Sequence, residues 1–559
     1  MTPVIASDVD ELVGTFVHPG EHLHLAATQA RPNALTYALC RVFGRQGNFS
    51  ISTTAVHSSA HALALSGCAR RVIAGFVGDT FPSPRPNPLY ERLAEGEPFE
   101  FEAWSLLSYV QRLLAGAMGV PYAVTGSLAG TDLAEGKGDQ LWQVDDPIRP
   151  GRQVTLAQAL RPDLTLVHGA CADEAGNIVM FPPLGEGPWA AYAARRGVIA
   201  SVERIVSSEE LRELSDRVVI PGQRVLGLCE APLGAHPQSL RAIGVPGVAS
   251  YLDDYAFLEH IVQQCQDDSR GRDWYQEWVL DVGSHAGYVS KLRDRRPTVP
   301  QRRPVESSAT RQERLIVLAA RAVVEQVRSG GYDTLLAGIG SSHMAAWLAA
   351  ELLQREGNEV KVAAELGAYG FSPQDGDVFL FSLRHAADSE ALSGIVEILG
   401  GMVSANPRAL GVLAAAEIDE TGTINTSRTA DGRWLTGSGG ANDIASSADC
   451  VVIATASPRR FVQEVSYRTS PGNRVREVVS QFGRFQRQGE ASPFRLTSWL
   501  PEDAQVVPDD PAAIDEAARA EIRERTSWRA AAADVLVEKP VTDEELSLLR
   551  TFDPDGRYR

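Results

Sequence analysis

The chain has 559 residues, of which 44% are apolar and 22% charged, a globular composition long enough for two or more cores. Its 71 acidic residues outnumber its 53 basic residues, and the formal net charge of −18 argues against nucleic acid as the main partner. No run reaches the roughly 18 consecutive apolar residues of a membrane span, so we expect no membrane-embedded segment.

The first 17 residues and the cysteines both indicate a reducing compartment. Asp8, Asp10 and Glu11 interrupt the amino-terminal stretch, which lacks the basic start and apolar centre of a signal peptide. The six cysteines form no C-x-x-C pair and mostly sit in apolar runs. We therefore expect buried free thiols and a cytoplasmic protein.

In the first half of the chain, short apolar runs alternate with helical patterns. Strands are predicted at residues 72–78, 164–169, 197–202 and 225–228. A helix is predicted from Leu106 to Met118, closed by Gly119. This alternation is typical of parallel sheets that helices cover on both faces.

Residues 291–314 differ sharply in composition, since they are rich in arginine and proline and nearly free of apolar side chains. The pattern predicts a linker at residues 293–312 that separates a domain at 1–292 from a domain at 313–559. An alternative is that the basic character marks an anion-binding strip.

Beyond this linker, a helix is predicted from Glu313 to Arg328, ending at Gly330 and Gly331. Strands are predicted near residues 334–337, 360–363, 378–382 and 450–454. The fold class is thus α/β, with two open and largely parallel sheets covered by helices. Ligands of such sheets bind beyond the carboxyl ends of the strands.

One carboxylate lies at such a strand end. In Lys-Val-Ala-Ala-Glu-Leu-Gly, residues 361–367, Glu365 closes an apolar run and a glycine follows almost at once. A glutamate in this place could equally be solvated or paired in an ordinary ion pair. Residues 335–343 precede it, another apolar run that leads into Gly338-x-Gly340 and His343.

A glycine-rich segment follows at residues 436–445, Thr-Gly-Ser-Gly-Gly-Ala-Asn-Asp-Ile-Ala. Glycines let backbone N–H groups approach a ligand oxygen closely, which is what an oxyanion site requires. The simpler interpretation is a turn that joins two elements.

These three segments, in this order, resemble the second half of class I coenzyme A transferases. In the first half, residues 17–23 and 164–178 resemble the A-type subunit of that family, and residues 233–239 resemble its glutaconate CoA-transferase branch. The resemblance implies A-type and B-type subunits fused in one chain, each half forming a related open-sheet domain. It implies acyl-CoA and a small carboxylic acid as substrates, no permanently bound cofactor, and a homo-oligomer.

The resemblance also implies roles for single residues. Glu365 would be the nucleophile that forms a glutamyl-CoA thioester, with Leu366 where many members carry asparagine. Gly437, Gly439 and Gly440 would form the oxyanion loop, which the side chains of Asn442 and Asp443 would pin in place. The expected CoA- and substrate-binding positions are Gly338, Gly340, His343, Gly367, Asn33 and Ser127, the last two on a wall supplied by the first half. For His343, a solvent-facing position at a helix start is an equally good interpretation.

Two departures from the family pattern leave the reaction open. Ala26 and Ala27 stand where glycines usually line the acid pocket, and Leu106 and Leu107 replace the Gln-Gly of ketoacid-specific members. The alternatives are an acyl-CoA hydrolase, a ring-opening C–C hydrolase or a decarboxylase with Glu365 as general base, or a non-catalytic acyl-CoA binder. The eleven histidines show no metal-binding spacing, so no metal site is predicted.

Overall fold

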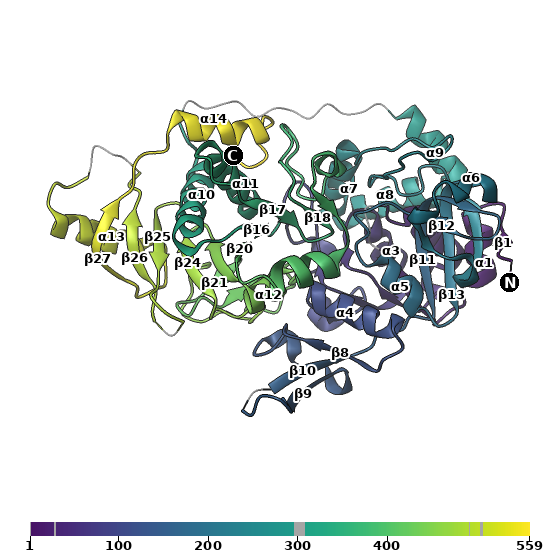
Figure 1. Ribbon diagram of the computed structural model, residues 1–559, viewed down its shortest axis with the longest axis horizontal. Helices are drawn as coiled ribbons and strands as arrows, with labels where there is room; N and C mark the ends of the chain where they lie inside the picture. Colours follow the sequence, from purple (N-terminus) through teal and green to yellow (C-terminus); the bar gives the residue numbers. More distant parts are fainter. Residues whose placement is uncertain (1, 27–29, 152, 296–307, 491, 503–506) are drawn as a thin grey trace.

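The computed structural model describes the chain except residues 1, 27–29, 152, 296–307, 491 and 503–506. Two α/β bodies lie side by side, each built on one large sheet, and a small third sheet projects from the first body (Figure 1). Most of the predicted linker, and Ala27 with its neighbours, lie outside the described residues.

The first large sheet has the strand order β1-β15-β13-β11-β2-β3-β5-β7, and every neighbouring pair along this path is parallel. All ten residues of β11 are buried, because helices and loops cover both faces of a parallel sheet. The strands, with the antiparallel additions β12 and β14, are β1 (Val4–Ile5), β2 (His22–Leu25), β3 (Phe49–Ser52), β5 (Ala69–Ala74), β7 (Glu100–Ala103), β11 (Leu164–Asp173), β12 (Ile178–Val179), β13 (Gly197–Val206), β14 (Val218–Ile220) and β15 (Val225–Glu230).

Short and medium helices surround this sheet. The predicted helix at Leu106 to Met118 is confirmed as α4 (Leu106–Ala117). The others are α1 (Val9–Phe16), α2 (Asn33–Phe43), α3 (His61–Ser66), α5 (Gly187–Ala193), α6 (Ser208–Arg212), α7 (Tyr255–Cys265), α8 (Asp268–Tyr275) and α9 (His285–Asp294).

The second large sheet has the order β19-β18-β17-β16-β20-β23-β24-β25-β26-β27, parallel from β17 to β24 and mixed at its edges. Its strands are β16 (Thr334–Ala337), β17 (Lys361–Ala364), β18 (Ala368–Tyr369), β19 (Ala391–Leu392), β20 (Ala409–Ala414), β23 (Asp449–Ile453), β24 (Val475–Val479), β25 (Gly483–Gln486), β26 (Arg495–Trp499) and β27 (Ala531–Val537).

The helix predicted after the linker is confirmed as α10 (Arg311–Gly330). Thr310 and Glu313 form a capping box at its start, and Gly331 ends it in the left-handed conformation with φ 67°. The other helices of this half are α11 (Ser341–Arg355), α12 (Ala441–Ser447), α13 (Pro511–Arg525) and α14 (Asp543–Phe552).

Three small sheets complete the fold. The projecting one has the order β8-β10-β9, formed by β8 (Tyr122–Thr125), β10 (Gln153–Gln158) and β9 (Leu141–Asp145). Two pairs, β4 (Ala55–Val56) with β6 (Phe76–Val77) and β21 (Glu417–Ile418) with β22 (Ile424–Asn425), lie beside the large sheets.

One predicted strand is wrong. Residues 378–382 form a turn, because the carboxylate of Asp377 accepts hydrogen bonds from the Phe379 N–H and the Ser382 hydroxyl and bends the chain there. Val378, Phe379 and Leu380 are still buried, and their apolar run resembled a strand in composition.

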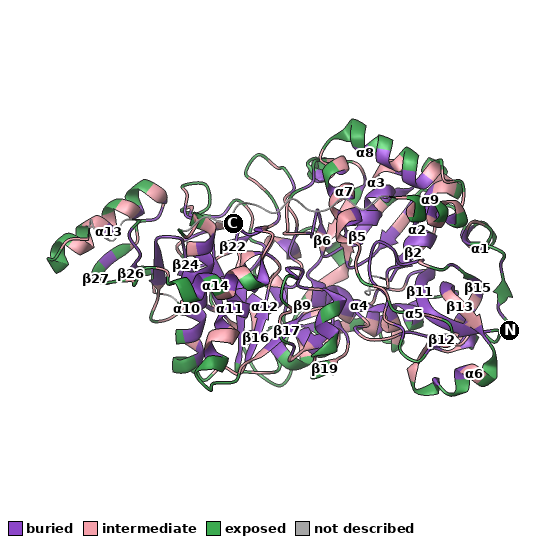
Figure 2. Ribbon diagram, turned by 90° about the horizontal axis from the view of Figure 1, so that it is seen from above, coloured by how far each residue is buried: buried purple, intermediate pink, exposed green. Residues whose placement is uncertain are grey.

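The two halves share one hydrophobic core. A single cluster contains Trp104, Leu107 and Val110 of the first half together with Leu399 and Ile444 of the second. Figure 2 shows the strands of both sheets as mostly buried and the outer helices as largely exposed. All six cysteines are free and buried, as predicted. Among the described residues, no helix combines the length and apolar character needed to cross a bilayer.

Candidate active site

Glu365 directly follows β17, at the carboxyl end of a parallel strand. Gly338 directly follows the neighbouring strand β16, and Ala415 follows β20. The carboxyl ends of parallel strands meet at one edge of a sheet, so the three positions lie together.

Glu365 lies in a groove of about 310 Å³ that both halves line. The second half supplies the ends of the strands and the glycine-rich loop. The first half supplies Phe76, Pro84 and Pro86 as the facing wall. A second hollow of about 370 Å³ shares Pro84, Ala415 and Arg460 with this groove and extends it toward the amino end of α11.

The surroundings of Glu365 favour its neutral form. Burial, and then the nearby carboxylate of Asp443, raise the pKa of Glu365 to about 8, whereas a hydrogen bond from the Gly440 N–H acts in the opposite direction. Burial also raises the pKa of Asp443 to about 6. Perturbed carboxylates in a groove are typical of functional sites.

Two glycines of the loop donate their N–H groups to backbone carbonyls, one of them across the two halves. The Gly439 N–H donates to the carbonyl oxygen of Gly75 at 2.9 Å, and the Gly437 N–H donates to that of Thr426 at 3.1 Å. Because these two donors are occupied, they differ from the free oxyanion donors that the sequence predicted. Gly440 instead supports Glu365 directly, and a Cβ atom at this position would collide with Glu365 Oε2.

The side chains of Asn442 and Asp443 bind backbone groups outside the loop, and two of these groups belong to the first half. Asn442 Oδ1 accepts from the Leu128 N–H at 2.9 Å, and its Nδ2 donates to the Thr469 carbonyl at 2.9 Å. Asp443 Oδ2 accepts from the Leu107 N–H at 2.8 Å. Both side chains are buried, and their contacts with Leu128 and Leu107 join the two halves.

His343 does not face solvent, and both of its ring nitrogens bind backbone groups. It is fully buried; its Nδ1 accepts from the Gly340 N–H at 2.8 Å and its Nε2 donates to the Val378 carbonyl at 3.1 Å. Burial lowers the pKa of His343 to about 3, so the ring is neutral and fixes the turn before α11.

Of the other three predicted glycines, two line one of the hollows and the third does not. Gly338 lines the groove beside Glu365, and Gly340, with φ 116°, lines the adjoining hollow. Gly367 lies outside the groove lining. Its φ of 134° and a tight approach to the Ser393 backbone make it a structural glycine that turns the chain after Glu365.

Asn33 and Ser127 are not part of the groove wall. Asn33 is the first residue of α2, and its Nδ2 donates to Ala235 O at 2.7 Å and to Gln238 Oε1 at 2.6 Å. Ser127 is buried behind the loop, where its hydroxyl hydrogen-bonds to the Asp443 carboxylate and lowers the pKa of that group. Both positions thus lie outside the residues that line the groove.

The sequence did not indicate which residues form the facing wall, nor that Arg460 lies at the site. Pro84 and Pro86 belong to a run with proline at 82, 84, 86 and 88, a signal of a rigid loop that did not indicate its location. Arg460 is exposed, lines both hollows, and donates from Nη1 to the Ala415 carbonyl at 3.2 Å. Among the described residues, no group of three His, Cys, Asp or Glu side chains could hold a metal ion.

Residues 6–230 match the family described as Coenzyme A transferase. The first half of the chain is therefore similar to coenzyme A transferases. This match, together with relatives named as CoA-transferase subunits, supports an enzyme of the CoA-transferase type and agrees with the resemblance seen in the sequence motifs.

Two curated relatives are A subunits of CoA-transferases, and each matches about a third of this chain. The A-type subunit of the 3-oxoadipate CoA-transferase from Pseudomonas knackmussii is 28% identical over 217 residues, which cover 38% of this chain and 71% of the relative. The A-type subunit of the glutaconate CoA-transferase from Acidaminococcus fermentans is 26% identical over 192 residues, covering 32% of this chain and 58% of the relative.

A solved structure extends the similarity in fold to the second half. The acyl-CoA transferase of Escherichia coli O157:H7, solved as a thioester complex with CoA, covers 96% of this chain and 95% of its own with a TM-score of 0.65. The sequence identity is 15%, so this similarity establishes the coenzyme A transferase fold alone.

Proposed function

We propose that the protein transfers CoA between carboxylic acids with Glu365 as the nucleophile. The observation that carries the proposal is the placement of Glu365. It lies at the end of a parallel strand, in a groove that both halves line, and its carboxylate accepts a hydrogen bond from the Gly440 N–H. A carboxylate whose pKa is raised is more basic, and therefore a stronger nucleophile once it is ionised.

The reaction proceeds through two exchanges. The Glu365 carboxylate attacks the thioester carbonyl, the C–S bond breaks, and a mixed anhydride and CoA thiolate form. The thiolate then attacks the Glu365 carbonyl of the anhydride, which releases the first carboxylate and leaves a glutamyl-CoA thioester. The acceptor carboxylate reverses the two steps and leaves as the new acyl-CoA, so Glu365 is regenerated.

We also propose that the chain is a fusion, with residues 1–292 of A type and residues 313–559 of B type. The family match within the first half and the shared core between the halves support this division. Acyl-CoA and a small carboxylic acid are the proposed substrates, and CoA acts as substrate with no permanent cofactor. The six buried free cysteines favour a cytoplasmic location.

A trapping experiment tests the covalent step. The protein is incubated with acetyl-CoA and treated with hydroxylamine or borohydride, and the peptide that contains Glu365 is examined by mass spectrometry. We expect a hydroxamate or the reduced alcohol at Glu365, dependent on the thioester. Glu365→Gln is the matched control, since it keeps the size of the side chain and removes the nucleophile.

The same experiment separates the alternatives. Release of free CoA without an added acid, with no trapped Glu365, would favour a hydrolase that uses Glu365 as general base. A changed acyl skeleton in the product would favour C–C hydrolysis or decarboxylation. Binding of acyl-CoA without turnover would leave a non-catalytic binder. Any of these outcomes contradicts transfer through a glutamyl-CoA thioester.

A further inference from the structure

The wall that faces Glu365 comes from a proline-rich loop of the first half, residues 79–88, which we call the wall loop. Pro84 and Pro86 line the groove, and Pro84 also lines the adjoining hollow. Neither residue has a polar side chain or a backbone N–H group. These two residues therefore contribute shape to the groove and no hydrogen-bond donor, so their effect on a bound thioester depends on where the loop is held.

The base of the wall loop is held within the first half. Backbone groups of Asp79 and Arg85 exchange two hydrogen bonds, of 3.0 and 3.1 Å. The carboxylate of Asp79 is buried and accepts three more, from His61, Asn87 and Gln266, at 2.9 to 3.2 Å. The base therefore has a fixed place that does not depend on the second half.

The tip of the wall loop, residues 80–84, is held by the second half. The Tyr558 hydroxyl donates a 2.6 Å hydrogen bond to the carbonyl oxygen of Pro82. Within the described part of the chain, no other hydrogen bond reaches the tip. Because Pro82 and Pro84 have no N–H group, the tip also has fewer donors than an ordinary loop with which to hold itself in place.

Packing adds to this hydrogen bond. The Phe81 ring is 2% exposed and stacks on Tyr255, with the ring centroids 4.5 Å apart. The guanidinium of Arg557 lies 5.1 Å from the centroid of Phe81, and the ring of Phe379 lies edge to face at 5.6 Å. Tyr255 belongs to the first half, whereas Arg557 and Phe379 belong to the second. The two halves thus hold the tip between them.

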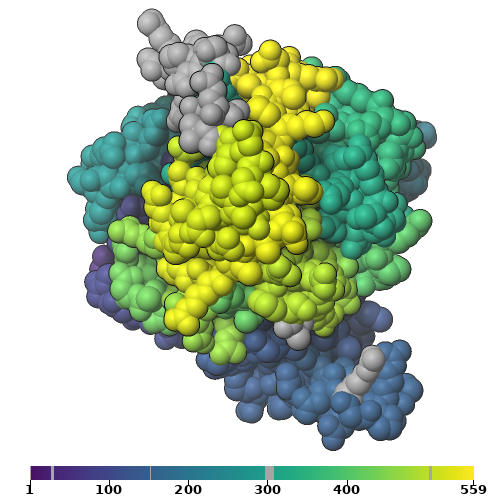
Figure 3. Space-filling model, turned by 90° about the vertical axis from the view of Figure 1, so that its left-hand side faces the viewer, coloured from purple at the N-terminus to yellow at the C-terminus, as the bar shows by residue number. Residues whose placement is uncertain are grey.

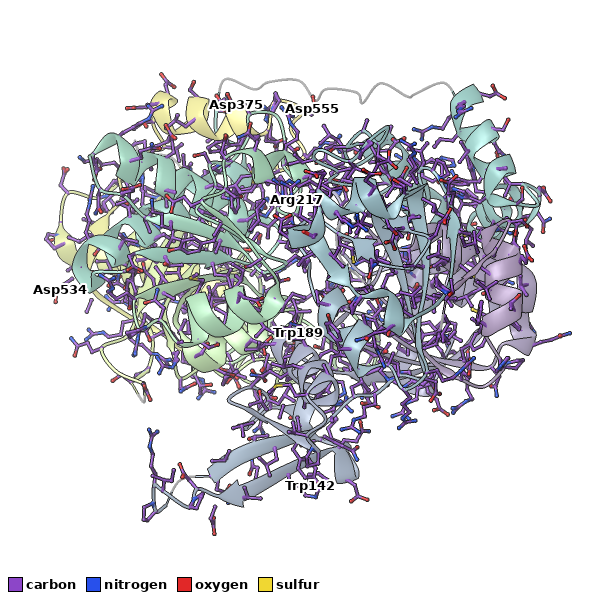
Figure 4. The ribbon with its side chains drawn as sticks, turned by 45° about the vertical axis from the view of Figure 1, so that its right-hand side comes forward. Trp142, Trp189, Arg217, Asp375, Asp534 and Asp555 are labelled. Carbon is purple, nitrogen blue, oxygen red and sulfur yellow. The ribbon has the colours of Figure 1, made fainter. Side chains whose placement is uncertain are left out.

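Tyr558 is itself fixed in the second half. Its N–H donates to Asp553 Oδ2 at 2.8 Å, and its ring lies nearly perpendicular to the buried ring of His343, with the centroids 5.6 Å apart. The helix α14 ends just before this segment, and Figure 3 shows that helix in yellow, packed on the second half. Figure 4 labels Asp555 in the same segment, near the boundary between the halves. An anchored ring therefore presents its hydroxyl to the first half.

We propose that Tyr558 is a positioning residue for CoA transfer: its hydroxyl keeps the tip of the wall loop over the groove, and the wall keeps water from the thioester at Glu365. This inference rests on the proposed function, because it concerns the fate of the glutamyl-CoA thioester. Enzymes that form a reactive intermediate exclude water from it, since hydrolysis wastes the turnover.

Loss of the hydroxyl should let the tip leave its position more often. A hydrogen bond of ordinary strength corresponds to about a tenfold change in an equilibrium, so displaced positions of the tip should be populated about tenfold more. Water that then reaches the glutamyl-CoA thioester adds to its carbonyl carbon, and the C–S bond breaks. The products are the Glu365 carboxylate, free CoA thiol and one proton, and no acceptor acid receives CoA.

The ratio of hydrolysis to transfer tests the proposal. The parent chain is given a panel of short-chain acyl-CoA thioesters and acids, and the pair that it transfers fastest is used to measure free CoA and new acyl-CoA together. Tyr558→Phe keeps the ring and should raise the ratio of free CoA to new acyl-CoA about tenfold. Tyr332→Phe is the matched control. It removes a hydroxyl that donates at 2.8 Å to Asp449, at the opposite ends of the strands, and should leave the ratio unchanged.

Hydrogen exchange gives a readout that needs no substrate. Mass spectrometry of a peptide that spans residues 79–88 should show faster exchange in Tyr558→Phe than in the parent or in Tyr332→Phe, and thermal melts check that all three are folded. Unchanged exchange in Tyr558→Phe overturns the proposal, as does an unchanged ratio of hydrolysis to transfer. A parent chain that transfers no CoA instead contradicts the proposed function, on which this role depends, so the parent alone tells the two failures apart.

Discussion

The backbone N–H of Leu107, in the first half, donates a 2.8 Å hydrogen bond to Oδ2 of Asp443, in the second half. Burial raises the pKa of Glu365, and the same Asp443 carboxylate raises it further. One buried side chain thus joins the halves and contributes to the raised pKa of the proposed nucleophile. Contact between the halves and the reactivity of Glu365 are therefore connected.

The first prediction concerns pH. Glu365 must be ionised to attack, and its pKa of about 8 lies above the ordinary value of 4.5, so kcat/KM should rise with pH and level off above about pH 8. Asp443→Asn removes the neighbouring charge and keeps an acceptor for Leu107, so the midpoint should move to lower pH. An unchanged midpoint in Asp443→Asn would show that Asp443 does not act on Glu365.

The same shift has a consequence for stability. Because the folded pKa of Glu365 is raised, its neutral form stabilises the protein below about pH 4.5, and this contribution is lost as the pH rises through 8. Glu365→Gln, which cannot ionise, should gain stability relative to the parent between these values. Urea unfolding at pH 5 and pH 9 measures the difference. Equal effects of the substitution at both pH values would contradict the raised pKa.

Gly440→Ala should disable the site without unfolding the protein. The backbone of Gly440 has an ordinary negative φ of −85°, but the added methyl group would collide with Glu365 Oε2. A displaced nucleophile should lower kcat by about 100-fold or more. Gly338→Ala is the control in the same groove, because its methyl group would meet nothing closer than Ser342 Oγ at 3.6 Å. Steady-state kinetics and thermal melts of both variants provide the comparison.

Substitution of Arg460 should change KM, whereas substitution of His343 should change the free energy of unfolding. Arg460→Ala removes an exposed cation from the groove and should raise KM for acyl-CoA by about 10-fold, the effect of one lost charge-assisted hydrogen bond, with little change in stability. His343→Ala leaves two buried backbone groups unpaired and should lower the free energy of unfolding by about 2–3 kcal/mol with KM unchanged. A higher KM in His343→Ala would instead support direct contact with CoA.

Dividing the chain tests the placement of the site between the halves. Cutting at Pro300 and co-expressing the two pieces should yield a complex with activity close to that of the intact chain, since both halves share one core and line one groove. The linker then serves to raise the effective concentration of one half for the other. Full activity of either piece alone would place the whole site within that piece.

Much of this architecture was predictable because it depends on local sequence. The periods of apolar residues identified α4 and α10, and the apolar run before Glu365 placed that carboxylate at a strand end, a position that parallel sheets use for ligands. The glycine after it and the glycine-rich loop were also local signals. Each depends on the order of a few neighbouring residues.

Only the tertiary structure decided which residues face Glu365. Phe76 and Pro84 are almost 300 residues away in the chain, and no local pattern brings them to the groove. The tertiary structure also buries His343, and it pairs the N–H groups of Gly437 and Gly439 with backbone carbonyls. Hydrogen-bond partners and groove walls depend on how the two halves pack, because burial requires each polar group to find a partner wherever the fold supplies one.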